Sequence, residues 1–350
     1  MRNSEIRLTK YSHGAGCGCK LSPAVLDKIL ANRSSAPDEA QRLLVGNHSR
    51  DDAGAYDLGD GQVLLSTTDF FMPIVDDPFQ FGRIASANAI SDIYAMGGRP
   101  VMAIAILGWP IDVLPAEVAG EVLEGSRSLC REAGVALAGG HSIDNREPIF
   151  GLAVNGLVEL PNLKRNDQGK VGDLLYLTKP LGVGILSTAE KKGLLREEDL
   201  GRAAESMMGL NSIGAELGKI RGVHGMTDVT GFGVLGHLTE MCQGAEVGAV
   251  IEFGAFKQLT DLGYYLRAGA IPGGTTRNWE SYGAQISEME EHKRQILADP
   301  QTSGGLLLAV DREDQGRIEA LFDQFGLQDF KEPVGVLVEL KEGLPLVEVR

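Results

Sequence analysis

The residues best suited to chemistry lie near the start of the chain, in the segment His13-Gly14-Ala15-Gly16-Cys17-Gly18-Cys19-Lys20. Glycines let backbone N–H groups converge on an anion and let the chain adopt positive φ angles. A thiol close to a lysine ionises more readily than an ordinary cysteine, which makes it a better nucleophile. The segment therefore predicts an anion-binding loop with a reactive sulfur and with Lys20 to neutralise phosphate. His13 fits either a hydrogen-bonding loop residue or a base.

Aspartates form the second group of candidate residues: Asp51, Asp52, Asp69, Asp92 and Asp228. Asp92 is the most informative because it lies in an otherwise uncharged helical stretch, one turn after Asn88. A carboxylate there costs roughly several kcal/mol unless it is paired or bound to a metal. Mg²⁺ takes carboxylate and phosphate oxygens together, so these aspartates predict a magnesium–nucleotide site. A helix cap or a turn residue is the alternative for any single aspartate, Asp228 above all.

Asp51 and Asp52 are adjacent on a segment expected to be extended. Neighbouring side chains on such a segment point to opposite faces, so only one of the two is expected in a given site. Two glycine-rich turns, Gly139-Gly140-His141-Ser142 and Thr302-Ser303-Gly304-Gly305, add weak support for phosphate binding. The P-loop, the dinucleotide-binding fingerprint and the protein-kinase signatures are absent from the sequence.

Composition narrows the class of protein. The chain has 350 residues and a formal net charge of −15, which argues against broad binding to nucleic acids or anionic membranes. Four cysteines are too few for a disulfide framework, and we expect Cys130 and Cys242 simply to pack in the interior. The longest apolar run, residues 101–107, is too short to span a bilayer, and no secretory signal is apparent. A cytoplasmic globular protein is expected.

Strand and helix patterns alternate along the chain, which predicts a mixed α/β fold. A polar segment rich in glycine at 161–172 resembles an interdomain linker, so we expect two domains. Helices are predicted at 22–32, 78–96, 115–133, 183–192, 203–219, 257–267 and 314–325, with another beginning at 231–236. Strands are predicted at 63–69, 101–107, 135–138, 149–158, 174–178, 306–310, 334–340 and 346–349.

Taken together, these segments resemble the selenophosphate synthetases, or selenide, water dikinases, of the aminoimidazole ribonucleotide synthetase-like superfamily. The resemblance covers nearly the whole chain, and the glycine-cysteine-lysine segment is its most specific part. The other matching motifs are Arg50-Asp51-Asp52-Ala53, Ser66-Thr67-Thr68-Asp69-Phe70-Phe71, Asn88-Ala89-Ile90-Ser91-Asp92, Ala138-Gly139-Gly140-His141-Ser142, Met226-Thr227-Asp228-Val229-Thr230-Gly231-Phe232-Gly233 and Asp299-Pro300-Gln301-Thr302-Ser303-Gly304-Gly305.

The resemblance implies conversion of ATP, selenide and water to selenophosphate, AMP and orthophosphate, which supplies selenium for selenocysteine and selenouridine. It makes Cys17 and Lys20 the catalytic residues and Asp52, Asp92 and Asp228 the Mg²⁺ ligands. It assigns the ATP site to Lys20, Ser49, Arg50, Asp51, Asp69, Asp92, Gly140, His141 and Ser142. It also leaves room for a monovalent cation and for a protein that delivers selenium.

The family architecture implies a glycine-rich catalytic loop (1–22), an N-terminal domain (23–160) and a C-terminal α/β domain (161–350). The N-terminal domain would bind ATP and Mg²⁺ and would form a homodimer through a β-barrel-like interface. Two alternatives stay open. One is an ATP-dependent kinase or synthetase of the same superfamily with another nucleophile. The other is a non-catalytic thiol carrier of metal or selenium, although a soft-metal carrier has no use for hard oxygen ligands.

Overall fold

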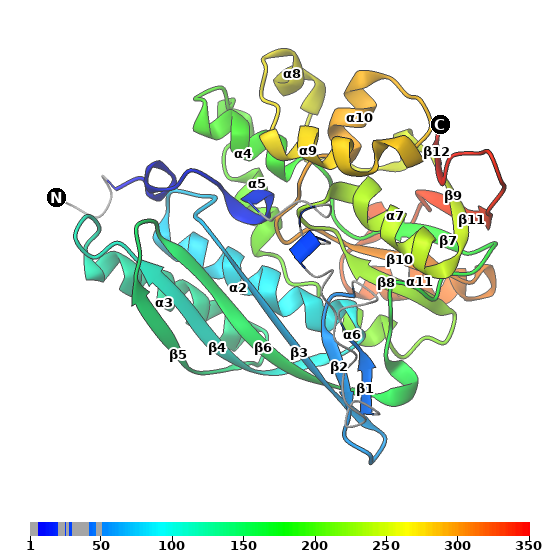
Figure 1. The fold of residues 1–350 in the computed structure, drawn as a ribbon, viewed down its shortest axis with the longest axis horizontal. Coiled ribbons are helices and arrows are strands. Elements are labelled where there is room, and N and C mark those ends of the chain that lie inside the picture. Colours follow the sequence, from blue (N-terminus) through cyan, green and yellow to red (C-terminus); the bar gives the residue numbers. More distant parts are fainter. Residues whose placement is uncertain (1–5, 20–24, 26–27, 30–41, 47–50) are drawn as a thin grey trace.

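The computed structural model describes residues 6–19, 25, 28–29, 42–46 and 51–350. Two six-stranded sheets organise this part of the chain (Figure 1). The N-terminal sheet, in spatial order, contains β1 (Leu43–Val45), β2 (Gly54–Asp57), β3 (Gln62–Phe71), β6 (Ile149–Glu159), β4 (Arg99–Trp109) and β5 (Ala136–Asp144). The C-terminal sheet contains β12 (Val347–Val349), β9 (Val247–Ile251), β11 (Gly335–Glu339), β7 (Leu174–Leu177), β10 (Leu306–Val310) and β8 (Val223–Asp228). The mixed α/β class expected from the sequence is confirmed.

Two long helices, α2 (Pro78–Ala95) and α3 (Ala116–Glu132), cover one face of the N-terminal sheet (Figure 1). Asp77 starts α2, because its side chain accepts a hydrogen bond from the backbone N–H of Gln80 and Pro78 occupies the first turn. The helices approach closely through Gly82, where a Cβ atom would lie 1.9 Å from a backbone oxygen of α3. The predicted helices 78–96 and 115–133 are confirmed within one residue at each end.

The remaining helices pack around the C-terminal sheet. They are α4 (Val183–Lys191), α5 (Arg202–Met208), α6 (Gly214–Leu217), α7 (Gly233–Ala245), α8 (Leu262–Arg267), α9 (Gly273–Tyr282), α10 (Glu291–Leu297) and α11 (Gln315–Gln324). Short 3-10 helices are η2 (Leu8–Tyr11), η3 (Gly16–Cys19), η5 (Leu160–Asn162), η6 (Glu197–Asp199), η7 (Phe253–Ala255), η8 (Gly283–Gln285), η9 (Arg312–Asp314) and η10 (Gln328–Phe330). No helix in the described part of the chain is long and apolar enough to cross a membrane.

Helix α2 also joins the two halves of the molecule, because it contacts α5, α6 and β8 besides its own sheet. Asn211, in the break between α5 and α6, donates from its amide to Ser91 Oγ on α2 and to the carbonyl of Gly304. The sequence predicted one continuous helix at 203–219, and this is wrong. The chain leaves the helix at the extended residue Gly209, which allows Asn211 to reach both partners.

Two other expectations differ from the structure. The helix predicted at 257–267 begins only at Leu262, where Asp261 caps it. Residues 139–142, predicted as a turn, lie inside strand β5. The helix predicted at 22–32 lies mostly outside the described residues. The first error arises because the polar residues before 262 do not break the apolar pattern, and the second because glycine pairs also occur within edge strands.

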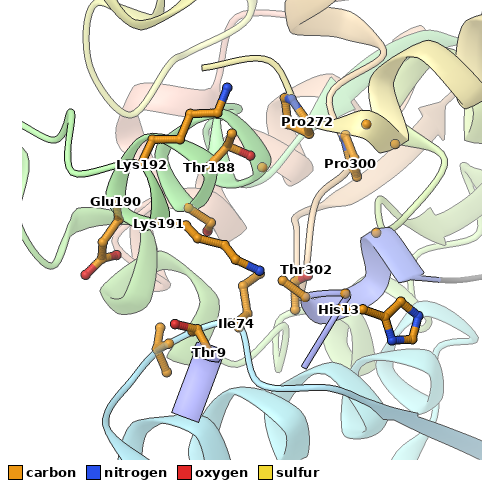
Figure 2. Close-up of a pocket in the computed structure, with 18 of the residues that line it drawn as sticks. Thr9, His13, Ile74, Thr188, Glu190, Lys191, Lys192, Pro272, Pro300 and Thr302 are labelled. Atoms are coloured by element: carbon orange, nitrogen blue, oxygen red, sulfur yellow. The ribbon is translucent and has the colours of Figure 1, made fainter. Parts of the chain in front are cut away.

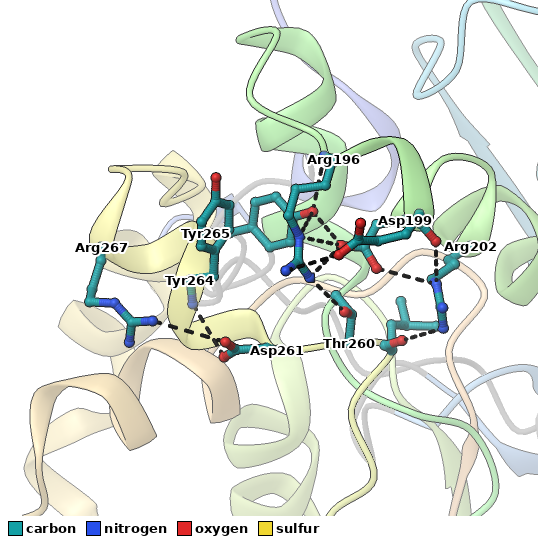
Figure 3. A network of polar contacts seen from close by, with 10 residues as sticks. Arg196, Asp199, Arg202, Thr260, Asp261, Tyr264, Tyr265 and Arg267 are labelled. Atoms are coloured by element: carbon teal, nitrogen blue, oxygen red, sulfur yellow. Dashed lines mark hydrogen bonds and ion pairs between the residues drawn. The ribbon is translucent and has the colours of Figure 1, made fainter.

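A buried ion-pair network attaches the segment between α4 and α5 to helix α8 (Figure 3). Asp199 is 1% exposed; its carboxylate pairs with Arg196 at 2.8 Å and with Arg202 at 3.2 Å. The hydroxyl of Tyr265 donates to the same carboxylate at 2.5 Å. Burial opposes ionisation, but the bonds from Tyr265, Thr260 and Arg196 lower the pKa of Asp199 below its usual value. The network therefore ties the segment between α4 and α5 to α8.

Candidate active site

Three carboxylates from distant parts of the sequence meet between the two sheets. Asp52 precedes β2, Asp92 lies on α2 and Asp228 is the last residue of β8. Each offers an oxygen atom, and these oxygens lie within 4.8 Å of one another. We call these three residues the acidic triad. The resemblance implied that the same three residues form one Mg²⁺ site, and the fold brings them together.

The triad concentrates negative charge in a partly dry environment. Burial raises the pKa of Asp52 well above its usual value, and the nearby carboxylates of Asp228, Asp92 and Asp51 raise it further. Only a hydrogen bond from the Thr227 hydroxyl, at 2.9 Å, acts in the opposite direction. Oδ2 of Asp52 is buried and has no hydrogen-bond partner among the described residues. Such a set of hard oxygen donors fits a divalent cation that would neutralise it.

The facing surfaces of β3 and α2 position the polar groups around the triad. Alternate residues of a strand point to one face, so Thr67 and Asp69 both face the helix, where Asn88 and Asp92 are one turn apart. Thr67 Oγ1 donates to Asp92 Oδ2, and Asn88 Nδ2 donates to Asp69 Oδ2, both at 2.5 Å. These two bonds hold both carboxylates against the sheet.

The side chains of Asp51 and Asp52 have different hydrogen-bond partners. Its Oδ1 accepts a hydrogen bond from the backbone N–H of Asn166 at 2.8 Å, and Arg165 lies 3.8 Å from its other oxygen. The adjacent aspartates therefore have separate environments, and Asp52 alone of the pair joins the triad. Asp51 instead links the start of the N-terminal sheet to the segment that leads into the C-terminal one.

Cys17, in η3, is only 1% exposed and its side chain faces α2. Its Sγ donates to Asn88 Oδ1 at 3.2 Å, and its backbone N–H donates to Thr302 Oγ1 at 2.9 Å. The backbone N–H of Ser303 also donates to Asn88 Oδ1, at 2.7 Å. Because Nδ2 of the same amide donates to Asp69, the orientation of Asn88 is determined, and its oxygen must face the thiol.

Glycines allow the chain to approach the buried thiol closely. A Cβ atom at Gly231 would lie 2.6 Å from the carbonyl oxygen of Cys17. Gly16 adopts a φ of +50°, and a Cβ atom there would lie 2.4 Å from Thr302 Oγ1. The glycines of the N-terminal segment and of the 226–233 motif are therefore required by packing around Cys17 as well as by any role in anion binding.

Lys179 belongs to this region but was not singled out by the sequence analysis. Its amine donates to the carbonyl of Ser303 at 2.8 Å and to that of Gly209 at 2.7 Å. Burial lowers the pKa of Lys179 to about 7, although Asp228 acts in the opposite direction. Ser303 has a φ of +50°, which is rare for a residue with a side chain. No sequence pattern marks Lys179 as functional, because a lysine directly after a strand is common.

Asp299 was part of a matching motif but had no predicted role. It is fully buried, and its Oδ2 accepts hydrogen bonds from the backbone N–H groups of Gly184 and Ile185 at the start of α4 and from Gln301. Burial raises the pKa of Asp299 to about 8. Asp299 therefore holds the 299–305 segment, and with it Thr302 and Ser303, against α4.

Three predicted nucleotide residues are not near the triad in this chain. Gly140, His141 and Ser142 lie on β5, the edge strand of the N-terminal sheet, separated from β3 by β6 and β4. At the usual strand spacing, three steps across the sheet correspond to about 14 Å. Lys20, Ser49 and Arg50 lie outside the described residues. His13 forms an ion pair with Glu147, with 2.8 Å between Nδ1 and Oε2.

Family models match both halves of the chain. The model described as AIR synthase related protein, N-terminal domain, covers residues 50–158, and the corresponding C-terminal domain model covers residues 170–343. Among curated proteins, the selenide, water dikinase of Aeromonas hydrophila is 57% identical over 346 residues, which is 99% of each chain. That of Escherichia coli O157:H7 is 56% identical over the full length of both.

Solved structures with low sequence identity share the fold. A thiamine-monophosphate kinase from Stenotrophomonas maltophilia is 18% identical, with a TM-score of 0.65 over 93% of this chain and 95% of that chain. The hydrogenase maturation protein HypE of E. coli is 19% identical, with a TM-score of 0.60 over 91% of this chain and 87% of that chain. At these identities the likeness concerns the fold alone.

Proposed function

This chain belongs to the AIR synthase related family and, within it, to the selenide, water dikinases, and we propose that it converts ATP, selenide and water to selenophosphate, AMP and orthophosphate. The supporting observation is the position of Cys17 relative to the acidic triad. The thiol bonds Asn88, and Asp92 of the triad is one helical turn further along α2. A soft nucleophile and a set of hard ligands for metal-bound phosphate therefore lie side by side.

Mg²⁺ fits the acidic triad on the grounds of donor type and charge. Asp52, Asp92 and Asp228 would hold it, since a divalent cation removes the mutual repulsion that raises the pKa of Asp52. Bound there, Mg²⁺ would neutralise phosphate oxygens of ATP and align them for in-line displacement. The triad thus supports magnesium, while a monovalent cation has no separate set of ligands assigned to it.

The other site residues keep the roles that the resemblance implies. Cys17 and Lys20 are proposed as the catalytic pair, and Ser49, Arg50, Asp51 and Asp69 as contacts for ATP. Asn88 supports this assignment because it connects the thiol to Asp69 within one amide group. Lys179 is a positioning residue in this scheme: it fixes the carbonyl of Ser303, whose N–H shares the Asn88 oxygen with Cys17.

A homodimer is proposed because one face of the N-terminal sheet carries exposed apolar side chains. Strand register places Phe70, Met102, Ile104 and Ile143 on the face away from α2 and α3. Each of these side chains is between 38% and 54% exposed. A second copy packed on this face, in the β-barrel-like interface that the family implies, would cover them. His141 projects to the same face as Ile143, so an ATP site there would involve the interface.

The domain division and the cellular setting remain proposals of the same kind. We place a catalytic loop at 1–22, an ATP- and magnesium-binding domain at 23–160 and an α/β domain at 161–350. A cytoplasmic location and a protein that delivers selenium suit an enzyme whose substrate is volatile and oxidisable. A non-catalytic thiol carrier is not favoured, because relatives at 56–58% identity are named dikinases over their full length.

Phosphorus NMR of an anaerobic reaction with ATP, Mg²⁺ and selenide tests the function directly. Selenophosphate, AMP and orthophosphate are expected in equal amounts with little free ADP, because a dikinase also hydrolyses the remaining β-phosphate. Stoichiometric ADP without AMP would identify a simple kinase of the same fold. ATP turnover that is independent of selenide would point to another nucleophile.

A further inference from the structure

A cavity of about 310 Å³ lies against the N-terminal segment (Figure 2). Its walls come from the N-terminal segment, the residues after β3, the C-terminal half of α4, the start of α9 and the turn at 300–302. No triad residue lines it. It is therefore separate from the magnesium site proposed above.

Cationic side chains dominate the charge of this cavity. Arg7, Lys191, Lys192 and Arg277 line it, against the carboxylates of Asp76 and Glu190. Three of the four cations have partners: Arg7 pairs with Asp76, Lys192 donates to the carbonyl of Gly269, and Arg277 donates to that of Gly18.

Lys191 is different. It has no hydrogen bond or ion pair with any described residue, and its amine points into the cavity, towards Thr302 (Figure 2). It is the last residue of α4. The charge of its amine is therefore available to a bound anion.

Only the thickness of the N-terminal segment separates the cavity from the thiol. Gly14, Ala15 and Gly18 line it, and so does Thr302, whose Oγ1 accepts the hydrogen bond from the backbone N–H of Cys17. The Cys17 side chain itself points the other way, to Asn88. A ligand held here would lie directly behind Cys17, which we propose as a catalytic residue.

The walls fit a small, polarisable anion better than a nucleotide. Ile74, Val75, Pro272 and Pro300 supply apolar surface, which accommodates a weakly hydrated anion. A metal-bound triphosphate needs several oxygen ligands, and those are gathered in the triad. The chain as a whole carries a net charge of −15, so an anion is repelled over most of its surface. The positive charge of this cavity offsets that repulsion next to the catalytic loop, where the anion would have to bind.

We propose that this cavity receives the hydrogen selenide anion, and that Lys191 attracts and holds the anion behind the Cys17 loop before reaction. This inference rests on the proposed function and adds to it the route of the selenium substrate. Lys191 is the anion-attracting residue in this scheme, and the acidic triad serves ATP.

The test is anaerobic steady-state kinetics of Lys191→Gln, Lys191→Glu and Lys191→Arg, with selenide and ATP varied separately. At low ionic strength, kcat/KM for selenide should fall roughly fivefold in Lys191→Gln and further in Lys191→Glu, and stay within twofold in Lys191→Arg. The KM for ATP and kcat at saturating selenide should not change. Lys219→Gln, which removes an equal charge outside the cavity, is the matched control.

Added salt should reduce the difference between wild type and Lys191→Gln, because screening weakens the attraction. The inference is overturned if all three variants keep the wild-type kcat/KM for selenide, or if Lys219→Gln loses as much as Lys191→Gln. It is also overturned if Lys191→Gln changes the KM for ATP or inhibition by orthophosphate instead, since the cavity would then bind phosphate. Failure of the proposed function is distinct, because wild type would then release no AMP in response to selenide.

Discussion

The thiol of Cys17 donates a hydrogen bond to Oδ1 of Asn88 over 3.2 Å, within the interior of the protein. An amide oxygen only accepts hydrogen bonds, so the thiol is the donor in this contact. The same amide group bonds Asp69 and Ser303. Asn88 therefore connects the N-terminal loop, the sheet and the turn at 301–305 through one side chain.

Asn88→Ala should lower selenide-dependent AMP formation at least tenfold, because Cys17 and Asp69 lose the group that orients them. Ser86→Ala is the matched control: Ser86 is equally buried on α2, but its hydroxyl bonds Gly82 and Ser126 on the other side of the helix. Melting temperatures of both variants separate lost stability from lost catalysis. Equal activity in the two variants would remove Asn88 from the site.

Cys17→Ser should abolish selenide-dependent turnover while leaving the melting temperature and ATP binding close to wild type. A hydroxyl fits the space of the thiol and still donates to Asn88, but it is a much poorer nucleophile. Cys19→Ser is the comparison and should retain most of the activity. Equal loss in both variants, or wild-type turnover by Cys17→Ser, would contradict the assignment of Cys17.

Asp92→Asn should weaken Mg²⁺-dependent binding of a non-hydrolysable ATP analogue by roughly tenfold or more. The substitution keeps the shape of the side chain and removes one charge from the triad. Isothermal titration across a series of Mg²⁺ concentrations measures the effect, with the exposed Asp112→Asn as control. An unchanged requirement for Mg²⁺ would exclude Asp92 as a ligand.

Asp299→Asn should make the stability of the folded protein less sensitive to rising pH. The pKa of Asp299 is raised to about 8, above that of an unfolded aspartate, so the folded state retains a proton that the unfolded state has lost. The stabilisation from this proton is complete below about pH 4 and disappears as the pH rises through about 8.

Asparagine mimics the protonated carboxyl and keeps its acceptor for the α4 N–H groups. The melting temperature of Asp299→Asn relative to wild type should therefore increase between pH 6 and pH 9. A difference that is constant over this range would mean that the carboxyl does not titrate there.

Asp199→Ala should destabilise the protein more than Glu198→Ala, because the carboxylate of Asp199 is 1% exposed and accepts hydrogen bonds from both Arg196 and Tyr265 (Figure 3). Urea unfolding measures the change, and Glu198→Ala, which removes a largely exposed partner of the same arginine, should cost less than about 1 kcal/mol. Similar losses of unfolding free energy in the two variants would show that the burial of Asp199 does not determine how much the network stabilises the protein.

The sequence by itself determined the elements that have strong periodicity and clear ends. Helix α2 was predicted at 78–96 and observed at 78–95, because a proline starts it and two glycines end it. Among the members of the acidic triad, Asp92 was singled out by its own sequence context, whereas the roles of Asp52 and Asp228 were implied by the resemblance to the selenide, water dikinases. A carboxylate in an otherwise uncharged helix can be recognised from the sequence alone, because the free-energy cost of burying it unpaired does not depend on the details of the fold.

Only the tertiary structure decided how these residues face one another. The separate partners of Asp51 and Asp52, the burial of Cys17 against Asn88, and the contacts of Lys179 all join segments far apart in the chain. The displacement of Gly140, His141 and Ser142 to an edge strand follows from strand order, which no local pattern encodes. Local propensity acts over a few residues, whereas a site at the junction of two sheets depends on contacts separated by tens to hundreds of positions.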